Sequence, residues 1–122
     1  MNTGKLCPEG WRMPTDSDWT TLMNFAGKES VAGGKLKEAG ESHWNSPNVG
    51  ATNEYKFTAL PGGFYNSNAY LSKGMSTFFW SANEAANPEF ASYFFMFSAG
   101  AEMIHYPQGD KKFGYSVRCI KK

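Results

Sequence analysis

Residues that commonly build catalytic or metal centres are scarce in this 122-residue sequence. It contains two cysteines and two histidines, which are Cys7, Cys119, His43 and His105. Zinc sites draw on several cysteine or histidine ligands with short, regular spacings. Cys7 and Cys119 stand near opposite ends of the chain, and neither has a histidine nearby. We therefore expect no metal site and no cofactor.

The sequence also lacks a long apolar segment and a strong net charge. No run of apolar residues approaches the ~20 that a transmembrane helix needs, and Met1–Lys5 does not contain the apolar stretch of a signal peptide. The formal net charge is +1, so no strong field attracts nucleic acid or anionic lipid. The Lys111–Lys112 and Lys121–Lys122 pairs are too short for a nucleic-acid patch. We expect no nucleic-acid partner and no direct membrane insertion.

Aromatic side chains, in contrast, are abundant. They make up 16% of a chain in which charged residues make up 19%. Many rings in a polar chain indicate either a β-rich domain or a surface that presents aromatic side chains to a ligand, and composition does not separate the two. The length suffices for one hydrophobic core but not for two. We expect a single domain over residues 1–122.

The first third of the chain carries the signals of a helix. Thr15 is a typical N-cap residue, and Asp18 follows three residues later, as in a capping box. Apolar residues then recur at helical spacing, and Gly27 is a typical residue just past a helix end. The pattern predicts a helix from about Ser17 to Ala26.

Less regular structure is expected after this helix. A second short helix or turn is predicted over residues 29–32, ended by Gly33–Gly34 and followed by a short exposed strand over residues 35–38. Residues 39–55 are rich in Gly, Asn, Ser and Pro without a period. We expect an ordered loop there, anchored by the apolar side chain of Trp44.

The rest of the sequence has the alternation and the turn residues of β-structure. The expected strands cover residues 57–60, 77–82, 91–97, 102–106 and 115–120. The strand over 91–97 has large apolar residues on both faces, whereas a half-buried strand alternates with polar residues. Either it is central and covered on both sides, or one face of rings is a binding surface, and we favour the core for most rings. The fold class is α+β.

Several strings along the chain resemble the Fibrobacter succinogenes major paralogous domain. The matching strings are Cys7–Asp16, Gly33–Glu38, Trp44–Asn48, Gly50–Glu54, Phe57–Gly63, Phe79–Ser81 and Gly114–Cys119. They occur in order and cover nearly the whole chain. The family domain usually begins further upstream, so the resemblance also implies that this chain lacks an N-terminal part.

The resemblance implies a C-type-lectin-like fold of the formylglycine-generating-enzyme and sulfatase-modifying-factor type. In this fold one or two helices are followed by a twisted antiparallel sheet with long loops. From the residues alone, Cys7 and Cys119 are equally well two separate thiols or a disulfide, and the resemblance favours the disulfide. It also implies an extracytoplasmic location, at the cell surface or secreted, in Bacteroidetes or Fibrobacter.

The resemblance does not extend to the chemistry of formylglycine-generating enzymes. Those enzymes use a pair of reactive cysteines late in the chain, with copper in some members, and Cys119 is the single late cysteine here. His43 and His105 are expected to be ordinary surface or hydrogen-bonding residues. Asn83, Glu84, Asn87 and Glu89 are the best candidates for a calcium site, but we favour a solvated turn. We expect no enzymatic activity.

A ligand-binding role remains for the C-terminal half, where related variable proteins of diversity-generating retroelements display their binding residues. The candidates are Asn83, Glu84, Ser92, Phe94, Glu102, His105 and Tyr106. Trp80 is expected in the core, and Arg118 could pair with a carboxylate such as Glu84. The expected ligand is a protein or a glycan, and the domain is a monomer or part of a larger surface protein. The alternatives are a structural or adhesion module, or a degenerate enzyme of the formylglycine-generating type.

Overall fold

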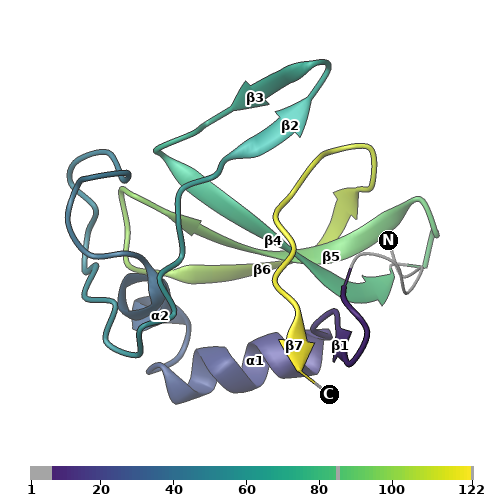
Figure 1. Ribbon diagram of the computed structural model, residues 1–122, viewed down its shortest axis with the longest axis horizontal. Helices are drawn as coiled ribbons and strands as arrows, with labels where there is room; N and C mark the ends of the chain where they lie inside the picture. Colours follow the sequence, from purple (N-terminus) through teal and green to yellow (C-terminus); the bar gives the residue numbers. More distant parts are fainter. Residues whose placement is uncertain (1–6, 85, 122) are drawn as a thin grey trace.

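Two helices precede most of the β-structure in the computed structural model, which describes residues 7–84 and 86–121 and leaves the Glu84 side chain undescribed. The elements are β1 (Trp11–Arg12), α1 (Asp16–Phe25), α2 (Glu29–Leu36), β2 (Phe64–Asn66), β3 (Ala69–Leu71), β4 (Ser76–Glu84), β5 (Phe90–Phe97), β6 (Met103–Asp110) and β7 (Ile120–Lys121). Figure 1 shows both helices on one side of the β4–β5–β6 sheet and the β2–β3 hairpin on the other. The predicted α+β class is confirmed.

Helix α1 begins with the predicted capping box. The Thr15 hydroxyl oxygen accepts a hydrogen bond from the Asp18 backbone N–H (3.2 Å), and the Asp18 carboxylate accepts one from the Thr15 backbone N–H (2.9 Å). These bonds satisfy backbone donors that the first turn of a helix leaves unpaired. Trp19 and Met23, one turn apart, are buried. The helix predicted over residues 17–26 is confirmed, with each end one residue earlier.

Helix α2 continues past the point where the sequence predicted its end. It passes through Gly33–Gly34 and ends at Leu36, so the short exposed strand expected over residues 35–38 is wrong. Leu36 and Lys37 are fully buried, and Lys37 forms one parallel bridge with Ala59 in place of a strand.

The two glycines of α2 allow close packing and do not end the helix. A β carbon on Gly33 would lie 2.1 Å from the carbonyl oxygen of Glu102, and one on Gly34 would lie 2.5 Å from that of Gly50. Only glycine leaves room for backbone at these distances. Tertiary packing therefore maintains a helix that the low helix propensity of glycine disfavours.

Strands β4, β5 and β6 form an antiparallel sheet with β5 in the centre. Phe94 of β5 pairs with Phe79 of β4 on one side and with His105 of β6 on the other. The predicted strands that this sheet confirms, with shifted ends, are those over residues 77–82, 91–97 and 102–106. Strand β5 is therefore central, which was one of the two possibilities open from the sequence.

Two other predicted strands are not continuous strands. Residues 57–60 contribute one bridge, at Ala59, because the left-handed backbone of Thr58 (φ 57°) interrupts the extended conformation. Residues 115–120 contribute one parallel bridge to β4, at Ser116, and then the start of β7. The second segment leaves the edge of β4 to reach β1, so it cannot pair along its whole length.

The main core lies between the helices and one face of the sheet. Trp19 packs against Phe79 and Phe94, with ring centroids 5.2 and 5.7 Å apart. Trp44, the predicted loop anchor, is buried, and its indole N–H donates to the Ala59 carbonyl oxygen (2.9 Å). Other buried members of this core are Met23, Ala26, Ala32, Leu36, Met96 and Met103. The long loop is thus fastened to the core that holds the sheet.

The two ends of the described chain are joined. Cys7 and Cys119 form a disulfide across a sequence separation of 112 residues, with their α carbons 5.9 Å apart. Next to it, β1 pairs with β7, so that Trp11 lies opposite Lys121. The disulfide that the resemblance implied is confirmed.

Candidate binding surface

The sheet has an aromatic face on the side opposite the helices. Because side chains alternate along a strand, Phe78, Tyr93, Phe95, Phe97 and Tyr106 share this side, and we call these five residues the aromatic face. Phe78 pairs with Phe95 at a ring distance of 4.9 Å, and Tyr93 pairs with Tyr106 at 5.1 Å. Four of the rings are half-buried, and Tyr106 is 40% exposed.

One end of the aromatic face is covered and the other is open. Tyr115 stacks on Phe78 (4.9 Å) and contacts Trp80 (4.4 Å). Trp80 is buried, as predicted, in a second core cluster with Met13 and Ala91. Burial raises the pKa of both Tyr93 and Tyr115 above the ordinary value. The other end of the face opens into a pocket of about 290 Å³. Its lining residues are Ser72, Met75, Ser76, Phe78, Phe95, Phe97, Ser98 and Ala99.

Ser92 and Phe94 were expected on a binding surface, and their expected exposure is wrong. Ser92 is 3% exposed and Phe94 is fully buried. Both lie on the helix side of the central strand, where Phe94 packs against Trp19. The other described candidates, Asn83, Glu102, His105 and Tyr106, are exposed. Glu84 ends β4, and its side chain lies outside the described residues.

Three of the predicted residues meet around Asp16, at the start of α1. The Ser92 hydroxyl donates to Asp16 Oδ1 (2.5 Å), and His105 Nε2 lies 3.4 Å from Asp16 Oδ2. The Asp16 backbone N–H donates to Asn83 Oδ1 (2.8 Å), and the Phe94 ring stacks on the His105 ring at 4.7 Å. The cluster therefore fastens the first turn of α1 to all three strands of the sheet.

This cluster does not have the geometry of a nucleophilic triad. In such a triad the histidine contacts the hydroxyl and the carboxylate orients the histidine. Here the carboxylate of Asp16 stands between Ser92 and His105. His43, the other histidine, lies on the surface, where its Nδ1 is 2.9 Å from a Glu38 carboxylate oxygen.

The predicted turn after β4 has its own hydrogen bonds. Asn87 Oδ1 accepts from the Glu89 backbone N–H (3.0 Å), and Asn83 Oδ1 accepts from Asp16 as described. Two of the oxygens considered for calcium are therefore engaged with backbone donors, which favours the solvated turn. Across residues 7–84 and 86–121, no group of three or more His, Cys, Asp or Glu side chains is placed to hold a metal ion.

Arg118 contacts Phe57, where a carboxylate was expected. One guanidinium nitrogen donates to the Phe57 carbonyl oxygen (2.6 Å), and the guanidinium lies 3.7 Å from the centre of the Phe57 ring. Burial lowers the pKa of Arg118 below its usual value. The side chain of Glu84, the carboxylate named for this pairing with Arg118, lies outside the described residues. The contacts with Phe57 give Arg118 a structural role.

The sequence did not predict the β2–β3 hairpin or the hollow beside it. Tyr65 pairs with Tyr70 across the hairpin, and the two turn residues Ser67 and Asn68 both have left-handed backbone, with φ of 52° and 66°. Two consecutive left-handed residues are typical of a tight hairpin turn, in which asparagine is favoured. The run Asn66–Ser67–Asn68 between two tyrosines was therefore a usable signal for the turn.

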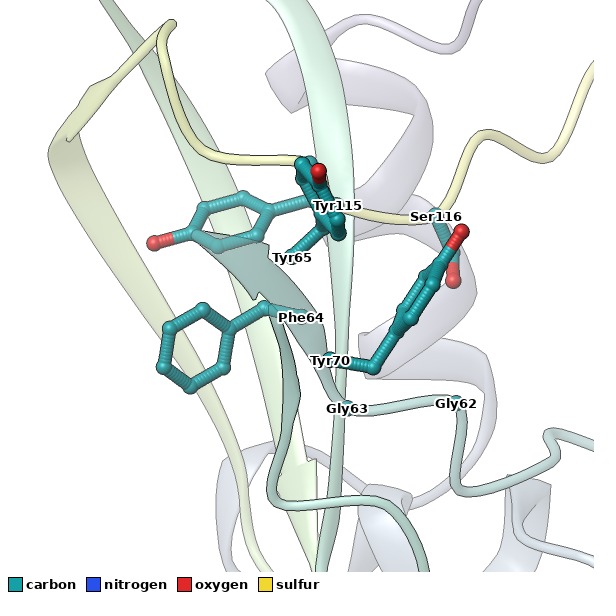
Figure 2. A pocket seen from close by; sticks show the side chains of 8 residues that line it. Gly62, Gly63, Phe64, Tyr65, Tyr70, Tyr115 and Ser116 are labelled. Atoms are coloured by element: carbon teal, nitrogen blue, oxygen red, sulfur yellow. The ribbon is translucent and has the colours of Figure 1, made fainter. Parts of the chain in front are cut away.

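We call the hollow beside this hairpin the hairpin cleft (Figure 2). It has a volume of about 380 Å³. Its lining residues are Gly62, Gly63, Phe64, Tyr65, Tyr70, Gly114, Tyr115 and Ser116. Tyr70 is 77% exposed and Tyr65 is 36% exposed, so two tyrosine rings of this cleft are open to solvent.

The fold and these surfaces place the chain in a structural class. It is a small α+β domain whose chain ends are linked by a disulfide and whose sheet has one face of partly exposed aromatic rings. Within the described residues, neither helix is long and apolar enough to cross a membrane. The model of the Fibrobacter succinogenes major domain family matches residues 1–121. The chain belongs to this family, which confirms the resemblance found in the sequence. No curated protein and no solved structure matches the chain.

Proposed function

We propose that this domain is a non-catalytic binding module of a bacterial surface or secreted protein, and that it holds a protein or glycan ligand on its C-terminal half. The observation that carries the proposal is the aromatic face. Contiguous rings that stay partly exposed in a folded domain mark interaction sites. Rigid rings also provide contact area at a low cost in side-chain entropy.

The ligand would lie along the exposed part of this face and its edge. Tyr106 offers an exposed ring, and the pocket of about 290 Å³ next to Phe95 and Phe97 offers a recess. Glu102, exposed just before β6, keeps its proposed role as a polar contact. His105 and Asn83 are left out of this surface, because both contact Asp16 on the helix side of the sheet. Ser92 and Phe94 are left out, because they are buried.

The absence of catalysis is part of the proposal. Both cysteines are joined in the disulfide, so neither is a thiolate that could attack a substrate. The hydroxyl of Ser92 donates to a carboxylate and not to a histidine. These contacts support a binding role and do not support a nucleophilic one.

The cellular location and the fold type are also part of the proposal. Disulfides persist mainly in oxidising compartments, so the Cys7–Cys119 bond supports an extracytoplasmic location. Two helices followed by an antiparallel sheet, with the chain ends tied together, support a C-type-lectin-like fold of the formylglycine-generating-enzyme type. An experimental structure with a different arrangement of β4, β5 and β6 would contradict the proposed fold.

The proposed function is tested by mapping where ligands bind. Backbone amide spectra of the labelled domain are recorded with a panel of candidate proteins and glycans, and amides of β5 and β6 are expected to shift. Tyr106→Ala is expected to weaken binding about tenfold, since one exposed stacking ring is lost. Tyr55→Ala is the matched control, because Tyr55 is 38% exposed and its ring packs against Phe25 of α1, with ring centroids 4.8 Å apart.

Two results would contradict the proposed function. One is that no member of the panel binds the domain or the intact protein that contains it. The other is that the bound ligand shifts amides of α1 and α2 alone and binds the Tyr106→Ala and Tyr55→Ala variants equally.

A further inference from the structure

We infer that the hairpin cleft is a subsite for a neutral sugar of an oligosaccharide chain. This inference rests on the proposed binding function and names a ligand class and a place that the function leaves open. It is carried by the arrangement of Tyr65 and Tyr70, by the uncharged lining of the cleft, and by the space at Gly62.

The two tyrosines form a corner. Their ring centroids are 4.9 Å apart and their planes meet at 62°. In Figure 2 the Tyr70 ring extends from β3 toward Ser116, while Phe64 and Tyr115 lie together on the other side. A pyranose presents apolar C–H groups on its faces and hydroxyls around its rim, so it can lie on one ring of such a corner and meet the second at its edge.

The polar groups of the cleft are neutral. Besides glycines and one phenylalanine, the lining consists of Tyr65, Tyr70, Tyr115 and Ser116. The Tyr65 hydroxyl already donates to Asn68 Oδ1 (3.2 Å), which fixes its orientation. Hydroxyl groups beside exposed rings suit a ligand rich in hydroxyls, whereas an anionic or cationic ligand would find no opposite charge in this lining.

The β2 side of the corner is anchored to the rest of the domain. Tyr65 and Gly114 exchange two backbone hydrogen bonds of 2.8 and 2.7 Å, which tie β2 to the segment before Ser116. On the inner side, the Phe64 ring packs against Phe78 (5.3 Å) and Phe113 (5.9 Å). A preformed site loses little entropy when its ligand binds.

The cleft also has room that a side chain could fill. A β carbon on Gly62 would meet only the Ser116 hydroxyl oxygen within 4 Å, at an ordinary contact distance of 3.5 Å. A second hollow of about 450 Å³ shares Gly62 as a wall. Its other lining residues are Ser42, His43, Asn45, Leu60, Pro61, Lys73 and Gly74. A chain of several sugars can therefore extend from the first hollow across Gly62.

The test uses soluble neutral tetrasaccharides of glucose, xylose or mannose as probes, with amide spectra as the readout. At least one probe is expected to bind with a Kd below about 1 mM and to shift the amides of Tyr65, Tyr70 and Ser116. Tyr70→Ala removes a stacking ring, and Gly62→Leu places a side chain in the cleft. Each is expected to raise the Kd about tenfold or more.

Phe25→Ala is the matched control for the loss of an exposed ring. Phe25 is 67% exposed and lies on α1, on the side of the sheet away from the hairpin (Figure 1), so this variant should bind as the unchanged domain does. Spectra of each variant without probe show whether it is folded. Gly62→Leu leaves both tyrosines in place. It therefore still tests the sugar subsite if the spectra show that Tyr70→Ala disrupts the hairpin.

Failure of this inference is distinguishable from failure of the proposed function. If no neutral tetrasaccharide binds, or if binding is unchanged in both Tyr70→Ala and Gly62→Leu, the hairpin cleft is not a sugar subsite. A ligand that shifts amides of Phe95, Phe97 and Tyr106 but none in β2 or β3 also overturns the inference, yet it supports the proposed function.

Discussion

Lys37 is a lysine without solvent exposure, and it connects three parts of the chain. Its ammonium group donates to the carbonyl oxygens of Val49 (3.0 Å), Phe97 (2.8 Å) and Gly100 (2.9 Å). It also lies 5.3 Å from the centre of the Trp44 ring. Burial lowers the pKa of Lys37 to about 8, so the group is still charged at neutral pH. The long loop, the end of β5 and the following turn thus share one donor group.

Replacing this donor group should destabilise the domain. In Lys37→Met the aliphatic stem is retained, but the three carbonyl oxygens lose their donor inside the protein. We expect the free energy of unfolding, measured by urea denaturation, to fall by about 3 kcal/mol, since buried polar groups left unpaired are costly. Lys112→Met is the control, because Lys112 is exposed and surface changes usually stay within about 0.5 kcal/mol. Equal stabilities of the two variants would contradict this role.

At the scale of single residues, the sequence predicted which side chains are buried better than it predicted which side of the sheet each one faces. It indicated the anchoring of Trp44 and the burial of Trp80, because large apolar side chains in a polar context favour the core. It could not show that Phe94 faces the helices while Phe95 faces away. Both positions carry rings, so the alternation on which such a prediction depends is missing. The buried role of Lys37 has no sequence signal.

Among the elements, the start of α1 is sensitive to acid. Arg12 donates two hydrogen bonds to the Asp18 carboxylate (2.5 and 3.2 Å), and the Thr15 backbone N–H donates a third. These bonds hold the pKa of Asp18 well below its usual value of 3.8. A carboxyl whose pKa is lower in the folded state stabilises the fold above its ordinary pKa, and this contribution is lost as the pH falls below it.

The acid sensitivity can be measured with Asp18→Asn. At pH 7 this variant should unfold at a lower urea concentration than the unchanged domain, because it loses the charged partner of Arg12. The difference should shrink as the pH is lowered from about 4 to about 2, since the unfolded chain then takes up a proton at Asp18 that the folded domain, with its lowered Asp18 pKa, does not yet bind. A difference that stays constant across this range would show that the Asp18 charge does not stabilise the fold.

Helix α2 depends on the absence of a side chain at Gly33. Although alanine is the better helix former, Gly33→Ala would force its methyl group against the Glu102 carbonyl oxygen. We expect a loss of about 1–3 kcal/mol in the free energy of unfolding, which is typical of overpacking. Ser30→Ala in the same helix, at an exposed position, should be neutral or slightly stabilising. A Gly33→Ala protein as stable as the Ser30→Ala protein would contradict the close approach.

Element prediction succeeded where the local pattern and the tertiary contacts agree. The capping box and helical spacing placed α1, and long apolar runs placed β4 and β5. It failed at α2, because a glycine pair usually ends a helix and here the packing partner is distant in sequence. The hairpin of β2 and β3 was missed because each strand is only three residues long. The hairpin cleft was missed with it.

For the whole molecule, the disulfide is the main constraint on the unfolded chain. Reduction, or the double change Cys7→Ser with Cys119→Ser, should lower the free energy of unfolding. In the chain-entropy model the loss for a loop of this size is roughly 4–5 kcal/mol, less any strain in the folded protein. Urea denaturation with and without reductant measures it. The double variant should not respond to reductant, and an unchanged domain that does not respond either would contradict the constraint.

The junction of Cys7 with Cys119 also determines how the domain carries mechanical load. A force that pulls on the two ends of the described chain meets a covalent bond before it meets any hydrogen bond of β4, β5 or β6. Everything between the two sulfurs is bypassed, including the hairpin on the far side of the sheet (Figure 1). Force applied to both ends of the described chain would therefore not reach a ligand bound at the hairpin, as long as the disulfide stays oxidised.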